Sequence, residues 1–245
     1  MSPPAPLLEV HGISKAFRGL RAVHEASFDV PERGLVALIG PNGAGKTTCF
    51  NLIAGALQPD RGAIVFGGTR IDGWRASRIC AAGIGRTFQI VKPFPGLSVL
   101  DNVIVGALLR ANGTQEARRH ARDVVDRLGL GRKADVPAST LTLPERKRLE
   151  VARALATRPR LLLLDEVMAG LRPTECDQMV QVLRELNARQ GVAILLIEHV
   201  MRAVMALAQH VVVLNFGQVL ARGTPAEVVR HPAVLGCYLG EEAEV

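Results

Sequence analysis

A glycine-rich stretch at residues 40–48 has the side-chain types and spacing that bind phosphate. It fits the pattern G-x-x-x-x-G-K-[ST], in which glycines let the backbone approach a phosphate and the amides at the start of the next helix point at the anion. In that pattern Lys46 is predicted to reach the β- and γ-phosphates of a nucleotide, and Thr47 to ligate Mg²⁺. The predicted nucleotide-binding residues are Gly40, Pro41, Asn42, Gly43, Ala44, Gly45, Lys46, Thr47 and Thr48.

The segments on either side of this stretch are those that a phosphate-binding loop requires. Residues 34–39 form a short apolar run typical of a buried strand, and residues 49–54 continue with helical spacing. A chance match to the pattern in a chain of this length has odds of roughly one in a hundred, and the flanking segments lower those odds further. The sequence therefore predicts a strand, a loop and a helix that together bind a nucleotide.

Two acidic residues end the apolar run at residues 161–164. In nucleotide hydrolases with a phosphate-binding loop, an aspartate at such a strand end orders Mg²⁺, which is the role predicted for Asp165. Glu166 is predicted to be the general base that polarises the attacking water. Many strands end in an acid, so this prediction depends on the glycine-rich loop at residues 40–48.

Two further polar residues close predicted strands. His199 follows residues 192–197, and the carboxyl ends of the strands are the edge at which an open α/β sheet binds ligands. His199 is predicted to hydrogen-bond a γ-phosphate, although a lone histidine is more often structural. Gln89 ends the strand predicted at residues 84–89 and is a candidate catalytic contact to Mg²⁺ or to water.

The composition is that of an ordinary globular chain, with 48% apolar and 22% charged residues among 245. The net charge of +7 suits an anionic partner, which leaves nucleic acid, a membrane surface, ATP and a merely solvated surface open. The four cysteines form no C-x-x-C pair, which indicates reduced thiols and neither a disulfide framework nor a zinc site. Residues 1–6 are not expected to be a secretory signal, and no segment is expected to span a membrane.

Strand and helix patterns alternate along most of the chain, but not in its middle. Strands are predicted at residues 7–17, 26–30, 63–66 and 84–89, and the alternation resumes at residue 160. Between residues 91 and 157, three helical patterns follow one another without a strand, which indicates an inserted helical subdomain. Strands that alternate with helices predict a mainly parallel core sheet, and thus an α/β fold.

These motifs follow the order found in the ATP-binding subunits of ABC transporters, which the chain resembles over nearly its whole length. The resemblance implies one domain over residues 1–245, with a P-loop NTPase core, a mainly parallel sheet, an antiparallel β subdomain and the inserted helical subdomain. The core would comprise residues 1–90 and 158–245, and the helical subdomain about residues 91–157. The resemblance further implies ATP and Mg²⁺ as cofactors and an aromatic ring, Phe17, stacked on adenine. A phenylalanine of the core is the competing interpretation.

Several segments narrow the resemblance to the branched-chain (hydrophobic) amino-acid importers. They are residues 85–89, 165–171 and 196–201, and the ending from residue 223 to residue 240. The resemblance implies two ATPase subunits, identical or different, that work on transmembrane permease subunits, while a periplasmic or extracellular substrate-binding protein delivers the cargo. It implies a peripheral position at the cytoplasmic face of the inner membrane, and no nucleic-acid partner is expected.

The family's signature, Leu-Ser-Gly-Gly-Gln, is replaced here by Leu-Thr-Leu-Pro-Glu, just before residues 147–153. In the family this motif faces the ATP of the partner subunit. Thr142 keeps the hydroxyl, but Leu143 adds bulk and Pro144 has no N–H. Thr142 and Glu145 also fit a capping box, which predicts that a well-formed helix start remains. We expect two unequal ATP sites if the partner subunit differs from this chain.

Two other functions remain open on the sequence alone. The predicted helical subdomain is dense in arginine and lysine from residue 118 to residue 148. This basic helical segment suits an ABC-type ATPase that acts on nucleic acid or ribosomes, although such proteins generally carry two cassettes or a long coiled-coil insert. The altered signature suits a partner subunit that binds ATP and hydrolyses it weakly, an interpretation opposed by the presence of both Glu166 and His199. The favoured prediction is an ATPase subunit that powers import, with leucine-like amino acids, other amino acids and amide-like solutes all open as cargo.

Overall fold

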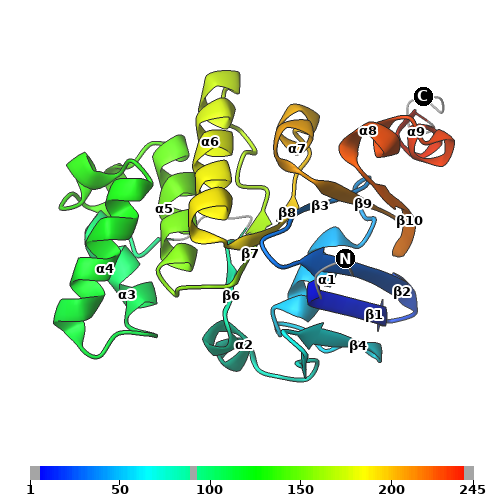
Figure 1. Cartoon of the computed structure of the whole chain (residues 1–245), viewed down its shortest axis with the longest axis horizontal. Coiled ribbons are helices and arrows are strands. Elements are labelled where there is room, and N and C mark those ends of the chain that lie inside the picture. The colour runs from blue at the N-terminus through cyan, green and yellow to red at the C-terminus, as the bar shows by residue number, and fades with distance from the viewer. Residues whose placement is uncertain (1–5, 89–92, 240–245) are drawn as a thin grey trace.

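The larger of two sheets forms the centre of the computed structural model, which describes residues 6–88 and 93–239 (Figure 1). Its strand order is β10-β9-β3-β8-β7-β6. Neighbouring strands are parallel except at the β9–β10 pair, which confirms the predicted mainly parallel sheet. The strands are β3 (Leu35–Ile39), β6 (Ile84–Arg86), β7 (Leu161–Asp165), β8 (Ala193–Ile197), β9 (His210–Asn215) and β10 (Gln218–Gly223).

The register of this sheet aligns the carboxyl ends of its central strands. Leu38 of β3 pairs with Ile197 of β8, and Ile197 pairs with Asp165 of β7. The segments that follow β3, β7 and β8 therefore leave the sheet at one edge. These segments carry the glycine-rich loop, Glu166 and His199, so the register alone brings the three predicted motifs together.

Both faces of the larger sheet are buried, which explains why its strands are continuously apolar. Alternate residues of β3 pack into two different cores, because successive side chains of a strand point to opposite faces. Leu35, Ala37 and Ile39 belong to one core, and Val36 and Leu38 belong to the other. The sheet is thus the middle layer of the molecule.

A smaller antiparallel sheet covers one of these faces together with α1 (Lys46–Ile53), as Figure 1 shows below the larger sheet. Its strand order is β2-β1-β4-β5, and it confirms the predicted antiparallel β subdomain. Its strands are β1 (Pro6–Phe17), β2 (Leu20–Pro31), β4 (Arg61–Phe66) and β5 (Thr69–Arg70). The sequence did not predict β5, which is only two residues long.

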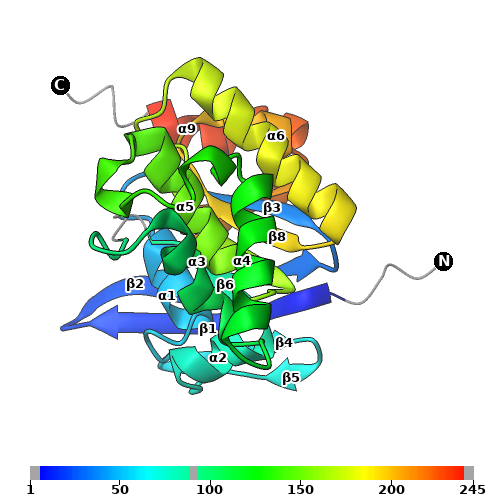
Figure 2. The same ribbon diagram turned by 90° about the vertical axis from the view of Figure 1, so that its left-hand side faces the viewer.

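The other face is covered by helices, three of which form one end of the molecule (Figure 2). In α4, the apolar residues Ala117, Ala121, Val124 and Val125 are buried, while the arginines between them lie toward solvent. The helices at this end are α3 (Val99–Ala107), α4 (Thr114–Arg127) and α5 (Leu143–Leu155). They follow one another along the chain, as the sequence predicted for its middle third.

The remaining helices connect or flank the strands. They are α2 (Ala76–Ala82), α6 (Pro173–Gln190), α7 (Met201–Leu207), α8 (Pro225–Val229) and α9 (Pro232–Leu239). Over residues 6–88 and 93–239, none of the helices combines the length and the apolar character needed to cross a membrane. The strand predicted at residues 84–89 ends at Arg86, and Gln89 lies outside the described residues.

Candidate nucleotide-binding site

The glycine-rich loop has a backbone that only glycine accommodates at two of its positions. Gly40 and Gly45 have φ angles of 147° and 99°. A Cβ at Gly40 would collide with the carbonyl oxygen of Leu214, and one at Gly45 with that of Ala22. The loop therefore packs closely against β9 and β2 on its protein side.

Lys46 is held inside this loop at the start of α1. Its Nζ donates to the carbonyl oxygens of Gly40 at 2.7 Å and Pro41 at 2.8 Å, and the side chain is buried. Burial lowers the pKa of Lys46, while the carboxylates of Glu166 and Asp165 act in the opposite direction. Nζ of Lys46 is thus centred where the loop would hold a phosphate chain.

Asp165 presents a buried oxygen that has no hydrogen-bond donor among the described residues. The residue is 1% exposed, and among the described residues its Oδ1 accepts no hydrogen bond. Its Oδ2 lies 3.6 Å from Nη2 of Arg86, and burial, reinforced by Glu166, raises its pKa against the attraction of that guanidinium. An unpaired buried carboxylate oxygen is costly without a cation, and Mg²⁺ prefers oxygen ligands. Asp165 and the exposed hydroxyl of Thr47 therefore fit a magnesium site.

Glu166 and His199 meet at the same edge of the sheet. Oε1 of Glu166 lies 2.9 Å from Nε2 of His199, and the N–H of Glu166 donates to the carbonyl of Ile197 at 2.9 Å. The φ angle of Glu166 is 50°, in the left-handed region that residues with a Cβ seldom adopt. The strained backbone turns the carboxylate toward the segment after β8, where the histidine orients it.

One pocket of about 310 Å³ brings the glycine-rich loop, Glu166 and His199 together. It is also lined by residues that the sequence did not single out: Leu20, Arg21 and Ala22 of β2, and Phe216 of the β9–β10 turn. The N–H of Gly217 in that turn donates to the carbonyl of Ala44 at 3.0 Å. The turn therefore stabilises the loop. This contact joins segments that are far apart in the sequence, so no local sequence pattern predicts it.

Phe17 and Thr142, which are also predicted to contact nucleotide, do not line this pocket. Phe17, at the end of β1, is 43% exposed, and Nζ of Lys15 lies 5.9 Å from its ring centroid. This exposure rules out a core phenylalanine and leaves the ring accessible to another group. Thr142 precedes α5, where the predicted capping box is present: its N–H and its hydroxyl each lie 3.0 Å from Oε2 of Glu145.

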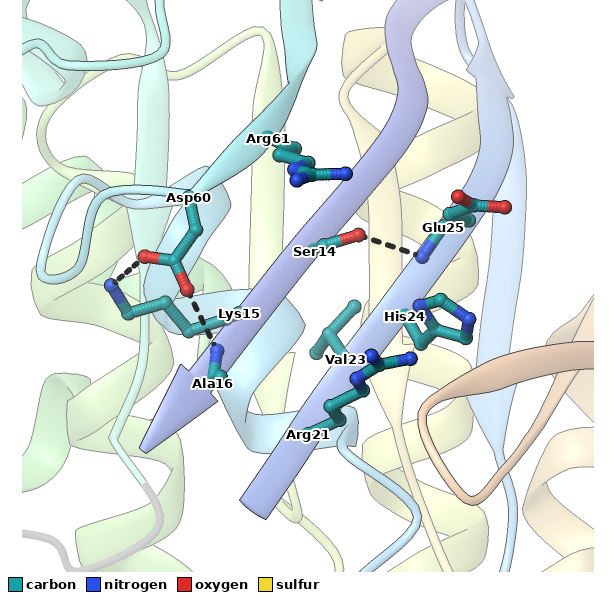
Figure 3. A pocket seen from close by; sticks show the side chains of 9 residues that line it. All are labelled: Ser14, Lys15, Ala16, Arg21, Val23, His24, Glu25, Asp60 and Arg61. Atoms are coloured by element: carbon teal, nitrogen blue, oxygen red, sulfur yellow. Dashed lines mark hydrogen bonds and ion pairs between the residues drawn. The ribbon is translucent and has the colours of Figure 1, made fainter. Parts of the chain in front are cut away.

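A second pocket of about 300 Å³ lies on the β1–β2 hairpin that ends at Phe17 (Figure 3). Asp60 braces it: Nζ of Lys15 donates to Oδ1 at 2.6 Å and the N–H of Ala16 to Oδ2 at 2.8 Å. Ser14 accepts a hydrogen bond from the N–H of Glu25 at 3.0 Å. This pocket contains neither the glycine-rich loop nor the Glu166–His199 pair, so its contacts position the hairpin and Phe17.

The site has the three features of a P-loop nucleotide-binding cassette. They are a glycine-rich loop at the edge of a parallel sheet, a buried aspartate suited to a cation, and a glutamate–histidine pair. Comparisons with known proteins identify the family. Residues 23–169 match the family model "ABC transporter", and residues 218–244 match "Branched-chain amino acid ATP-binding cassette transporter". The chain belongs to the ABC transporter family and is an ATPase subunit of this family, as the sequence predicted.

The similarity to individual proteins extends over the full chain. The chain is 39% identical to the high-affinity branched-chain amino acid transport ATP-binding protein BraF of Pseudomonas aeruginosa, over 96% of this chain and 98% of BraF. It is 37% identical to LivG of Escherichia coli strain K12, which has the same description, over the same shares. The solved ADP conformation of MJ1267, an ATP-binding cassette of an ABC transporter, superposes with a TM-score of 0.88 at 28% identity, over 96% of this chain and 99% of that one.

Proposed function

We propose that this chain hydrolyses ATP at the pocket after β3, β7 and β8 and so powers the import of branched-chain amino acids. The observation that carries the proposal is the Glu166–His199 pair, 2.9 Å apart, in the same pocket as the glycine-rich loop. The names of BraF and LivG and the match at residues 218–244 support the choice of cargo. The alternative cargoes, which the experiment below compares with branched-chain amino acids, are other hydrophobic amino acids and amide-like solutes.

The residues of the pocket divide the work of binding. Lys46 would exchange the carbonyls of Gly40 and Pro41 for the β- and γ-phosphates, with amides of the loop and of Thr48 around them. Asp165 and Thr47 would hold Mg²⁺, with Gln89 as the further ligand that the sequence predicts. When bound, Mg²⁺ neutralises the charge that develops on the β- and γ-phosphate oxygens.

The chemical step depends on Glu166 and His199. The Glu166 carboxylate would accept a proton from water as the water oxygen attacks the γ-phosphorus, while the bond to the β-phosphate oxygen breaks and ADP leaves. His199 would keep Glu166 aimed at that water and donate to a γ-phosphate oxygen. Phe17 would stack on adenine with its exposed ring face.

The assembly needs a second cassette, because the pocket of this chain is incomplete. Neither Thr142 nor any other residue at the start of α5 lines it. A partner's signature would cover the γ-phosphate, and Thr142 of this chain would face the partner's ATP. Permease subunits would dock from the membrane side, so the chain would lie on the cytoplasmic face, and a substrate-binding protein would act from the opposite side.

The basic helical segment offers less free charge to nucleic acid than its composition indicates. Nζ of Lys133 donates to Glu145 at 2.9 Å, and that of Lys147 to the carbonyl of Glu166 at 2.7 Å. Guanidinium groups of Arg118 and Arg122 lie 3.9 and 3.8 Å from acidic side chains. These intramolecular pairs favour the importer over a nucleic-acid-binding ATPase.

An affinity pull-down from gently solubilised native membranes tests the proposal. We expect two multi-span permeases and a second cassette to accompany the chain. Vesicles that contain this assembly should then take up leucine and valine with ATP, and amide-like solutes should not compete. Recovery with ribosomal or nucleic-acid components and no membrane protein would contradict the importer, and uptake of only other solutes would contradict the proposed cargo.

A further inference from the structure

The turn that follows β7 is held by backbone contacts on both sides of Glu166. The N–H of Glu166 donates to the carbonyl of Ile197, and Nζ of Lys147 donates to the carbonyl of Glu166 at 2.7 Å. Two residues further on, the N–H of Met168 donates to Oε1 of Glu198 at 2.9 Å. Since the φ angle of Glu166 is 50°, the turn needs such contacts to keep a conformation unfavourable for a residue with a Cβ.

Two of these contacts come from ionisable side chains, Lys147 and Glu198, and both are buried. Lys147 is 5% exposed and Glu198 is 2% exposed. Burial lowers the pKa of Lys147 and raises the pKa of Glu198 to about 7, and each group's charge acts on the other against these shifts. Charged residues are seldom buried without a specific partner, and the partners here are backbone groups of one turn.

Lys147 and Glu198 reach this turn from different parts of the molecule. Lys147 belongs to α5, the helix whose start carries Thr142, whereas Glu198 follows β8 in the larger sheet and precedes His199. The turn is thus fixed on one side by the helical segment and on the other by the sheet. A displacement of α5 along or around its axis would move Nζ of Lys147 relative to the carbonyl of Glu166.

We propose that Lys147 and Glu198 are positioning residues for Glu166, and that Lys147 makes the aim of the Glu166 carboxylate depend on the seating of α5. The inference rests on the proposed role of Glu166 as the general base. When α5 is displaced, the carbonyl of Glu166 loses Lys147 as its hydrogen-bond donor, and the turn can relax. Hydrolysis would then proceed only with α5 seated against the turn.

Steady-state ATP hydrolysis by the assembly of this chain with its second cassette tests this link. Lys147→Met removes the donor and keeps an unbranched side chain of similar length, and Arg148→Met is the matched control, since it removes one hydrogen bond, to Gln178, from the next residue of α5. We expect Lys147→Met to lower kcat roughly tenfold to a hundredfold, as a misplaced catalytic group does. KM and the Kd for ATP should stay within about twofold, and both variants should unfold at similar temperatures.

Glu198 provides the second arm. Glu198→Gln keeps an oxygen that can accept from the N–H of Met168, whereas Glu198→Leu does not. We expect kcat to fall with leucine and to recover most of its value with glutamine. Equal losses in the two variants, or a loss expressed in KM and not in kcat, would overturn the assignment of Glu198.

A double-variant experiment separates this inference from the role of Glu166. If Lys147 acts through Glu166, Lys147→Met should not lower further the single-turnover rate that remains in Glu166→Gln. A reduction of that residual rate by the same factor as in the native background would overturn the inference. If Glu166→Gln is slow while Lys147→Met equals Arg148→Met, the inference fails alone; if Glu166→Gln hydrolyses at the native rate, the proposed general base fails and the inference with it.

Discussion

At the scale of single residues, the proposed mechanism assigns the binding of ATP and its cleavage to different side chains. Lys46 and the loop lie after β3, whereas Glu166 and His199 follow β7 and β8. In the proposed mechanism the loop binds ATP with backbone amides and one ammonium group, and none of these can take a proton from water at neutral pH. The carboxylate of Glu166 can, so the two functions should respond separately to substitution.

The variant Glu166→Gln should bind ATP and fail to cleave it. Glutamine keeps the size of the side chain and an oxygen toward Nε2 of His199 but is not a base. We expect kcat to fall at least about a hundredfold, in line with the loss of general base catalysis, while the Kd for ATP is unchanged or lower. Radioactive ATP that stays bound and intact would support this, and rapid release of phosphate by the variant would count against Glu166.

At the scale of elements, the turn between β9 and β10 braces the glycine-rich loop. Gly217 has a φ of 78°, and a Cβ there would lie 2.9 Å from the carbonyl oxygen of Ala22. Gly68 has a φ of 77° in the β4–β5 turn, but a Cβ there would meet no atom within 4 Å. These two glycines therefore share a backbone conformation and differ in what they touch.

A comparison of Gly217→Ala with Gly68→Ala should separate the effect of backbone strain from the effect of losing the contact between the turn and the glycine-rich loop. Both variants should lose about 1 kcal/mol of unfolding free energy because alanine is unfavourable at positive φ, and Gly217→Ala should lose more because its Cβ would lie 2.9 Å from the carbonyl oxygen of Ala22. Only Gly217→Ala should also weaken ATP binding, since it displaces the donor to Ala44. Urea unfolding and ATP titration measure the two effects, and equal affinities in the two variants would show that the turn does not brace the loop.

The segment after β8 should make stability depend on pH. Burial raises the pKa of Glu198 from 4.5 to about 7, with the charge of Glu166 acting in the same direction and that of Lys147 opposing it. The neutral carboxyl is favoured in the folded chain, so its contribution is complete below pH 4.5 and is lost as pH rises through 7. The loss is on the order of 3 kcal/mol.

Glu198→Gln should remove that dependence, because an amide does not titrate. Relative to the native chain, the variant should gain unfolding free energy between pH 5 and pH 8, as urea titrations at both values would measure. Lys147 and Glu166 are present in both chains, so the difference between the two curves reports the titration of Glu198 and its electrostatic coupling to these neighbours. Parallel curves for the two chains would mean that Glu198 is ionised throughout and that its burial is compensated elsewhere.

Sequence patterns predicted those parts of the site that depend on local spacing. The loop, Asp165 and Glu166 each adjoin a buried strand, and the parallel register then brings them together. Lys147 and Glu198 could not be found this way, because Lys147 stands in a run of basic residues that resembles a solvated surface. Phe216 lines the pocket because its turn packs on a loop that is far away in the chain. The spacing of apolar residues does not predict such a contact.

At the scale of the whole molecule, we infer that the altered signature makes this chain a weak cover for another cassette's ATP. α5 starts at Leu143, and Pro144 occupies its first turn. Glu145, where the family has glutamine, already accepts from Thr142 and from Lys133. The helix start is stable, but one amide donor is missing and the Thr142 hydroxyl has an intramolecular acceptor.

In an assembly with a different second cassette, the two ATP sites should therefore turn over unequally. Loss of one charge-assisted hydrogen bond corresponds to about 1.5–3 kcal/mol, or roughly a tenfold to hundredfold slower step. Glu166→Gln should abolish most hydrolysis, while the equivalent change in the partner should abolish little. Replacing both Leu143 and Pro144 by glycine should speed the slow site, and equal rates at both sites of the native assembly would defeat this account.

The most direct test of the central claim is ATP hydrolysis by the reconstituted assembly, measured with and without leucine-loaded substrate-binding protein on the outer side. The account predicts that loaded binding protein stimulates hydrolysis, that leucine enters the vesicles, and that Glu166→Gln in this chain abolishes both. Hydrolysis that ignores the binding protein, or leucine uptake that persists with Glu166→Gln, would contradict the account.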